Sequence, residues 1–117
     1  MTIKVTVDAT GAVVCNPEIK SKSKGKGTIT WELKTSGYDF VDMQFLDPQP
    51  AAGIFSNKVV KPNKITLDDN NPGGSVAVDY PYAITVVATS AKSDRMASSS
   101  LRSPETTRSP IIRNDPG

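Results

Sequence analysis

Hydrophobic and polar side chains alternate along much of this chain, and the alternation is cleanest at residues 28–34. There Ile29, Trp31 and Leu33 are separated by threonine and glutamate. Successive side chains of a β-strand point to opposite faces of its sheet, so this pattern predicts a half-buried strand with one solvent-exposed face. The only tryptophan of the chain is therefore expected at the centre of the core.

Similar patterns predict strands elsewhere, and turn residues separate them. The expected strands cover residues 2–7, 12–15, 28–34, 38–46, 64–67 and 82–88. An irregular segment at 51–57 is expected to cross between the sheets. Pro81 has no backbone N–H, which predicts either a bulge or a strand that begins near Tyr82.

These short β-prone runs, with turns between them, predict an all-β protein. We expect one domain over residues 1–117, built as a two-sheet β-sandwich of about seven short, mainly antiparallel strands with a Greek-key topology of cupredoxin-like or immunoglobulin-like type. Residues 90–109 are polar and predict a surface excursion. Ile111 and Ile112 follow it, so residues 110–114 are expected to return to the sheet as a strand.

Strict alternation within 38–46 leaves apolar side chains on both faces of that strand, with Phe40 and Leu46 sharing the second one. An apolar flank of this kind is expected to be covered by a loop or a partner. The polar excursion carries Met96 and Leu101. We expect this excursion either to stay disordered in a monomer or to order only across a subunit contact, where these two residues would cover the flank of a homo-oligomer.

The composition of the chain limits which partners and which cellular compartment are expected. The chain has 117 residues and a formal charge of +2, which is too mild for a nucleic-acid or membrane surface. No apolar run approaches the roughly 20 residues that span a bilayer. The single Cys15 cannot form an intrachain disulfide, and no secretion signal precedes Ile3. We therefore expect a soluble cytoplasmic protein in which Cys15 is a small buried side chain.

Four lysines recur at every second position between residues 19 and 27: Lys20, Lys22, Lys24 and Lys26. In an extended backbone they would form a comb on one side, which could bind phosphates or an acidic polymer. The alternative interpretation is a solvated edge strand or hairpin tip, where lysines block pairing with another sheet. No aromatic side chain interrupts the comb, which disfavours a nucleic-acid surface.

No catalytic or metal-binding constellation is evident. Without histidine, acid–base chemistry would fall to carboxylates such as Asp47, Asp68, Asp69 and Asp79, and nothing in the sequence pairs any two of them. Copper and zinc sites need imidazole or several thiolates, so we expect no metal and no cofactor. Residues 68–74 contain oxygen ligands, but their spacing is that of a turn rather than a calcium loop.

Three short motifs are shared with a known group of proteins: Ile29-Thr30-Trp31-Glu32-Leu33, Gly37-Tyr38-Asp39-Phe40 and Pro110-Ile111-Ile112-Arg113-Asn114. With the hydrophobic spacing between them, the chain resembles the uncharacterised DP-EP family of small bacterial β-sandwich domains. The resemblance implies a cupredoxin-like or immunoglobulin-like fold and no particular activity. Cupredoxins bind copper through two histidines and a cysteine, and this chain has no histidine.

These observations favour a non-catalytic binding or accessory module of unknown ligand, acting alone or as an oligomer, because β-sandwiches present loops and sheet edges on a rigid frame. An anion-binding module that uses the lysine comb is the alternative. A carboxylate-based enzyme is the third and least supported class.

Overall fold

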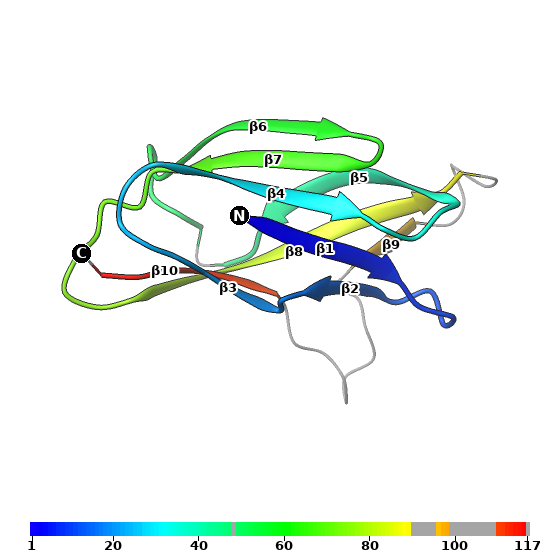
Figure 1. Cartoon of the computed structure of the whole chain (residues 1–117), viewed down its shortest axis with the longest axis horizontal. Coiled ribbons are helices and arrows are strands. Elements are labelled where there is room, and N and C mark those ends of the chain that lie inside the picture. Colours follow the sequence, from blue (N-terminus) through cyan, green and yellow to red (C-terminus); the bar gives the residue numbers. More distant parts are fainter. Residues whose placement is uncertain (48, 90–95, 99–109, 117) are drawn as a thin grey trace.

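The protein folds as two packed β-sheets, which confirms the predicted all-β sandwich (Figure 1). The computed structural model describes residues 1–47, 49–89 and 110–116, together with the backbone of 96–98. No helix occurs in these ranges. The predicted polar excursion at 90–109 lies outside them, except for that short backbone segment.

The first sheet has five strands in the order β2-β1-β4-β7-β6. Its members are β1 (Thr2–Val7), β2 (Val13–Asn16), β4 (Gly27–Leu33), β7 (Lys64–Asp69) and β6 (Phe55–Lys61). β1 runs parallel to β4, and the other neighbours are antiparallel. A tight turn joins β1 to β2, and Gly11 adopts a φ of 85° there, which glycine does without steric cost.

The second sheet has the order β3-β10-β8-β5. Its members are β3 (Ile19–Lys22), β10 (Ile111–Asn114), β8 (Val78–Ala88) and β5 (Tyr38–Phe45), and the short β9 (Met96–Ser98) also pairs with β8. β10 is the returning strand predicted at 110–114. It runs parallel to β3 and antiparallel to β8. Pairing is mainly antiparallel, as predicted, but the chain forms more strands than expected.

Trp31 lies at the centre of the core, as the alternation predicted, with no solvent exposure. Its indole Nε1 donates a hydrogen bond of 3.0 Å to the Tyr82 hydroxyl, and the two rings meet edge to face at 5.4 Å. Because a buried indole N–H needs an acceptor, Tyr82 allows the tryptophan to sit in the middle of an apolar layer. Cys15 packs in the same core and is also buried, as expected.

The strict alternation predicted for 38–46 is wrong, because β5 contains a bulge. Phe40 lies opposite Val86 and Asp42 lies opposite Thr85, so Val41 is an extra residue without an opposite partner. A bulge of this kind shifts the alternation by one position. Phe40 and Met43 consequently both face the core, whereas Val41 is 40% exposed.

The interruption predicted at Pro81 is also wrong, since β8 runs unbroken through it. The Pro81 carbonyl accepts a hydrogen bond from Leu46 N at 2.9 Å, just beyond the end of β5. In antiparallel strands the N–H and C=O of one residue point to the same side. The missing N–H therefore faces the side on which β5 has already ended, and no ladder bond is lost there.

The expected irregular segment at 51–57 ends earlier than predicted, because β6 begins at Phe55. β6 forms a hairpin with β7, and its register shifts between Ser56 and Val59. Asn57 adopts a φ of 57° within this irregularity. The local sequence lacks clean alternation because the strand is bulged at this point.

Candidate functional site

The four lysines predicted to form a comb do not share one face. Lys20 lies opposite Ile112 and Lys22 lies opposite Asn114, and both of those partners are buried. Directly opposite residues of neighbouring strands project from the same side of a sheet. β3 therefore turns these two lysines toward the inside of the sandwich, at its edge.

Lys22 is almost fully buried, with 6% exposure. Its ammonium group donates to the carbonyl of Ser23 at 2.7 Å and also to the carbonyl of Gly25. Lys24 and Lys26 follow the end of β3 and are exposed, and Lys26 Nζ lies 3.9 Å from Asp68. Lys22 is buried whereas Lys24 and Lys26 are exposed because only Lys22 belongs to β3, a short edge strand. An inward-pointing charge on such a strand prevents its edge from pairing with another sheet.

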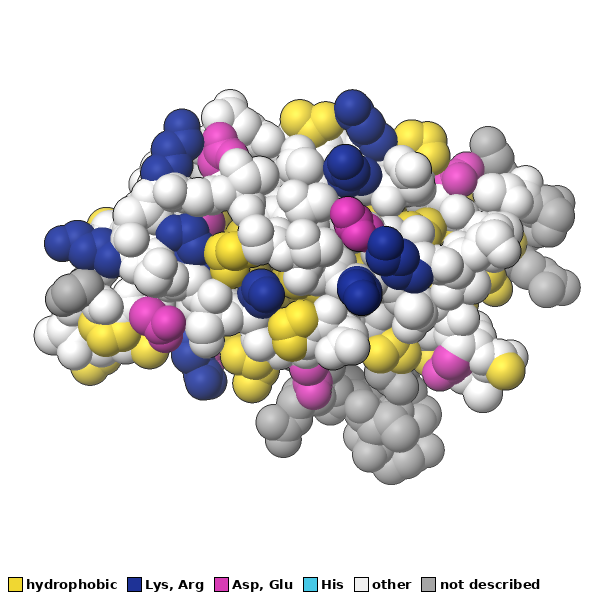
Figure 2. All heavy atoms as spheres, in the orientation of Figure 1, with side chains coloured by type: hydrophobic (Ala, Val, Ile, Leu, Met, Phe, Trp, Pro, Cys, Tyr) yellow, Lys and Arg dark blue, Asp and Glu magenta, His cyan; other side chains and the backbone are white. Residues whose placement is uncertain are grey.

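A different set of lysines is brought together on the outward face of the first sheet. Lys4 of β1 lies opposite Glu32 of β4, which lies opposite Lys64 of β7, which in turn lies opposite Lys61 of β6. The residues flanking them in each strand are buried or half-buried, so this row faces solvent. Figure 2, which views this face, shows basic side chains gathered on it.

Lys34 completes the group, which we call the cross-strand lysine row: Lys4, Lys34, Lys61 and Lys64 around Glu32. Lys34 Nζ lies 2.9 Å from Glu32 Oε1. The hydrogen bond from Lys34 and its charge, with smaller contributions from Lys64 and Lys4, hold the pKa of Glu32 below its ordinary value. Four lysines and one ionised glutamate give the cross-strand lysine row a formal charge of +3.

Threonine side chains form a second row beside the first. Thr2 lies opposite Thr30, and Thr30 lies opposite Thr66. Each is two residues from a member of the lysine row, a separation of about 6.5 Å along a strand. Ammonium groups and hydroxyls are therefore arranged in parallel lines over β1, β4 and β7, and both can donate hydrogen bonds to anionic oxygens.

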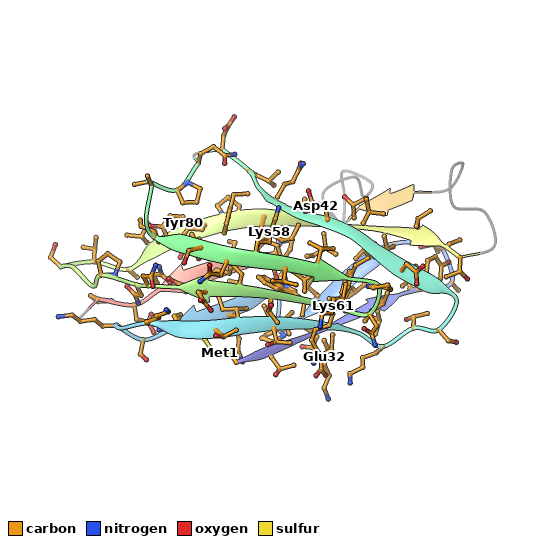
Figure 3. The ribbon with its side chains drawn as sticks, turned by 90° about the horizontal axis from the view of Figure 1, so that it is seen from above. Met1, Glu32, Asp42, Lys58, Lys61 and Tyr80 are labelled. Carbon is orange, nitrogen blue, oxygen red and sulfur yellow. The ribbon has the colours of Figure 1, made fainter. Side chains whose placement is uncertain are left out.

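A shallow hollow of about 400 Å³ opens between β5 and β6, which are edge strands of the two sheets. Phe45 and Phe55 line it with ring centroids 4.5 Å apart. Lys58 Nζ donates to Asp42 Oδ1 and to the Met43 carbonyl, both at 2.9 Å, and so bridges the two strands. Figure 3 shows Asp42 and Lys58 side by side there. This bridge satisfies both charges and closes part of the β5 edge.

The predicted partner-contact flank is not formed as expected. Phe40 is buried in the core because of the β5 bulge, so it cannot contact a partner. Leu46 is half-buried. Met96 contributes only backbone to the described residues, and Leu101 lies outside them. Whether the excursion contacts a neighbouring subunit stays a prediction.

The carboxylates considered for catalysis are dispersed. Asp79 forms a two-pronged ion pair with Arg113 at 2.7 and 3.0 Å. Asp68 accepts hydrogen bonds from Thr28 and Asn57, whereas the adjacent Asp69 is buried on the opposite face of β7. Within the described part of the chain, no group of three or more acidic, cysteine or histidine side chains is placed to hold a metal ion.

No protein-family model matches this chain, and no curated protein matches it either. The described residues contain no helix long and apolar enough to cross a membrane. The cross-strand lysine row is therefore the feature of this protein that points to a function. Sequence inspection missed this row because its members are far apart in the chain, and the only signal was one lysine of the row within or directly after each of four strands.

Proposed function

We propose that this protein is a non-catalytic binding module that recognises an acidic partner through the outward face of its first sheet. The main support for this proposal is the strand register, which places Lys61 directly opposite Lys64. The row continues from Lys64 through Glu32 to Lys4. Like charges directly opposite each other destabilise a sheet. An anionic partner would relieve this repulsion, so the same feature that costs stability favours binding.

The chemistry of the face favours carboxylates presented by an acidic protein segment. Apart from Glu32, the groups of the lysine and threonine rows are ammonium and hydroxyl donors, which suit anionic oxygens. Single-stranded nucleic acids are usually bound with aromatic platforms that stack on the bases, and the rows of lysines and threonines contain none. The +3 charge of the cross-strand lysine row exceeds the +2 of the whole chain, so steering of an acidic partner would act at this row.

The sequence-based interpretations fit this proposal in part. The resemblance to the DP-EP family carries a fold without an activity, as expected for an accessory module. A cytoplasmic setting agrees with a single cysteine that needs no oxidising compartment. Homo-oligomerisation would place two such faces in one assembly and raise the avidity for a polyanion. Light scattering on the purified protein would establish the assembly state.

Binding of poly-L-glutamate at several salt concentrations tests the proposed function. The variant Lys61→Thr/Lys64→Thr keeps strand-forming residues in the sheet and removes the like-charge pair. The matched control, Lys24→Thr/Lys26→Thr, removes two exposed lysines of the predicted comb and the same amount of charge.

We expect the wild type and the control to bind with affinity that falls as salt rises, and the row variant to bind at least tenfold more weakly. Equal losses in both variants would show that only net charge matters. A selective loss in the control would move the site to the comb, and tighter binding of a single-stranded oligonucleotide would make the partner a nucleic acid.

A further inference from the structure

The apolar core ends in a layer of buried polar side chains at the end of the sandwich where β7 and β10 finish, at the left of Figure 1. Asp69 follows Leu67 on the inward face of β7, and Asn114 follows Ile112 on the inward face of β10. Lys22 takes the equivalent place on β3. Asp69, Asn114 and Lys22 are 0%, 4% and 6% exposed, so each polar group there needs a partner inside the protein.

Hydrogen bonds in this layer join the two sheets. Asn114 Nδ2 and the Asn71 backbone N–H both donate to Asp69 Oδ1, at 3.0 and 2.9 Å. The Asn71 side chain donates to the carbonyls of Lys22, at 2.7 Å, and Asp115, at 3.1 Å. Asp69 belongs to the first sheet, whereas Lys22 and Asn114 belong to the second. The layer therefore clamps the sheets together at this end.

Two oxygens of the layer are left over. Asp69 Oδ2 and Asn114 Oδ1 are fully buried, and neither accepts a hydrogen bond from any described residue. Both are acceptors as long as Asp69 is ionised, so they cannot satisfy each other. A proton on Asp69 Oδ2 would supply the missing donor. A carboxylic acid and a primary amide can then share two hydrogen bonds, one in each direction.

The charged surroundings of Asp69 act in opposite directions. Burial disfavours the carboxylate, while the positive charge of Lys22 favours it. Lys22 Nζ, however, donates to the carbonyls of Ser23 and Gly25. Tyr80 faces Asp69 from β8, and its pKa is raised mainly by burial and also by the aspartate charge.

The strand neighbours of Asp69, Gly27 on β4 and Phe55 on β6, carry no charge. Burial is the larger influence on the carboxyl group, and the pKa of Asp69 is raised above its ordinary value of 3.8.

We propose that Asp69 carries a proton on Oδ2 and donates it to Asn114 Oδ1, so that an acid–amide pair clamps the two sheets and loss of this proton to solvent loosens the clamp. The pair explains both leftover oxygens with one hydrogen atom. It also explains why an amide, rather than a basic side chain, lies opposite the aspartate on β10.

The direction of the pH dependence follows from the raised pKa. A carboxyl group that holds its proton more tightly in the folded than in the unfolded state contributes full stability below the unfolded-state pKa of about 3.8. That contribution is lost as pH rises through the folded-state pKa. The end of the sandwich that contains Asp69 should therefore be tighter in mild acid than at neutral pH.

NMR titration of the wild-type chain tests the proposal without any substitution. The side-chain carboxyl ¹³C resonance of Asp69 should titrate above pH 3.8, and the Asn114 side-chain amide resonances should move with the same midpoint. Amide exchange at Gly73 and Asp115, whose N–H groups are bonded within this layer, should accelerate above that midpoint. An Asp69 carboxyl that is already ionised at pH 4 would overturn the proposal and indicate a donor of another kind, such as bound water.

Urea denaturation of Asp69→Asn between pH 4 and pH 8 provides the second arm. The introduced amide keeps a donor at the Oδ2 position and cannot ionise, so the variant should lack the loss of stability that the wild type shows with rising pH. For each unit by which the folded-state pKa exceeds 3.8, the folded-to-unfolded ratio of the wild type should fall about tenfold relative to the variant.

Asp68→Asn is the matched control, since hydrogen bonds from Asn57 and Thr28 hold the pKa of the neighbouring Asp68 below its ordinary value. The control should keep the wild-type slope. Identical slopes in all three proteins would contradict the acid–amide pair.

Discussion

The hydrogen bond between Trp31 and Tyr82 can be removed with almost no change in volume, by the substitution Tyr82→Phe. Both residues have no solvent exposure, and the Trp31 Nε1 to Tyr82 Oη distance is 3.0 Å. Phenylalanine keeps the edge-to-face ring contact but leaves the indole N–H without its acceptor.

The magnitude follows from the burial of the orphaned group. A buried donor left without a partner costs about 1 to 3 kcal/mol. Of a total stability of roughly 5 to 15 kcal/mol, this is a substantial fraction. We therefore expect Tyr82→Phe to destabilise the protein by about 2 kcal/mol, without loss of the fold.

Urea unfolding followed by far-UV circular dichroism, which reports on every variant whether or not it retains Trp31, measures this cost as a lower midpoint at an unchanged slope. Tyr38→Phe is the control, because that half-buried ring packs against the core away from the Trp31 hydrogen bond. In a Trp31→Phe background the cost of Tyr82→Phe should shrink, because the donor is gone. An equal cost in both backgrounds, or a cost no larger than that of the control, would refute the reasoning.

Four further predictions concern single side chains. Trp31→Ala should cost about 3 to 5 kcal/mol and leave the domain close to unfolding at room temperature, as measured by urea denaturation. Burial raises the pKa of the Cys15 thiol to about 12. A thiol reagent at pH 8 should therefore react with Cys15 only at the rate of unfolding. For the same reason, the free energy of unfolding should decline from about pH 9 toward pH 12. Gly27→Ala would bring a Cβ to 2.7 Å from Lys22 Cε, so it should destabilise the wild type more than a Lys22→Ala background. Lys61→Glu should stabilise the sheet by about 0.2 to 1 kcal/mol in low salt and less in high salt, while weakening poly-L-glutamate binding.

The layered fold and the place of Trp31 could be predicted because alternation is a local signal. Residues 28–34 alternate cleanly, and the physics of a half-buried strand leaves only one way to orient them. The same argument found β1, whereas the returning β10 was predicted from two isoleucines that follow a polar stretch. Each of these strands pairs without a bulge over its whole length, so the period of two is intact.

The errors fall where a local pattern depends on a distant partner. The bulge at Val41 arises because β5 must follow β8, and nothing within 38–46 marks it. Pro81 is harmless in β8 only because β5 ends beside it. The layer formed around Asp69 and Asn114 resembled a turn and a strand end when each segment was considered alone.

The positions of the lysines could not be predicted from the local sequence either, and these positions bear on function. Lys20 and Lys22 are neighbours in the chain, yet β3 turns them inward, whereas Lys4, Lys61 and Lys64 come from three strands and share one outward row. Only the folded register creates this row, because unfolding disperses its charges along the chain. A partner that recognises the row therefore binds the native state in preference to the unfolded state, and its binding free energy adds to the stability of the fold. Poly-L-glutamate should accordingly raise the unfolding temperature of the wild type and leave that of Lys61→Thr/Lys64→Thr nearly unchanged.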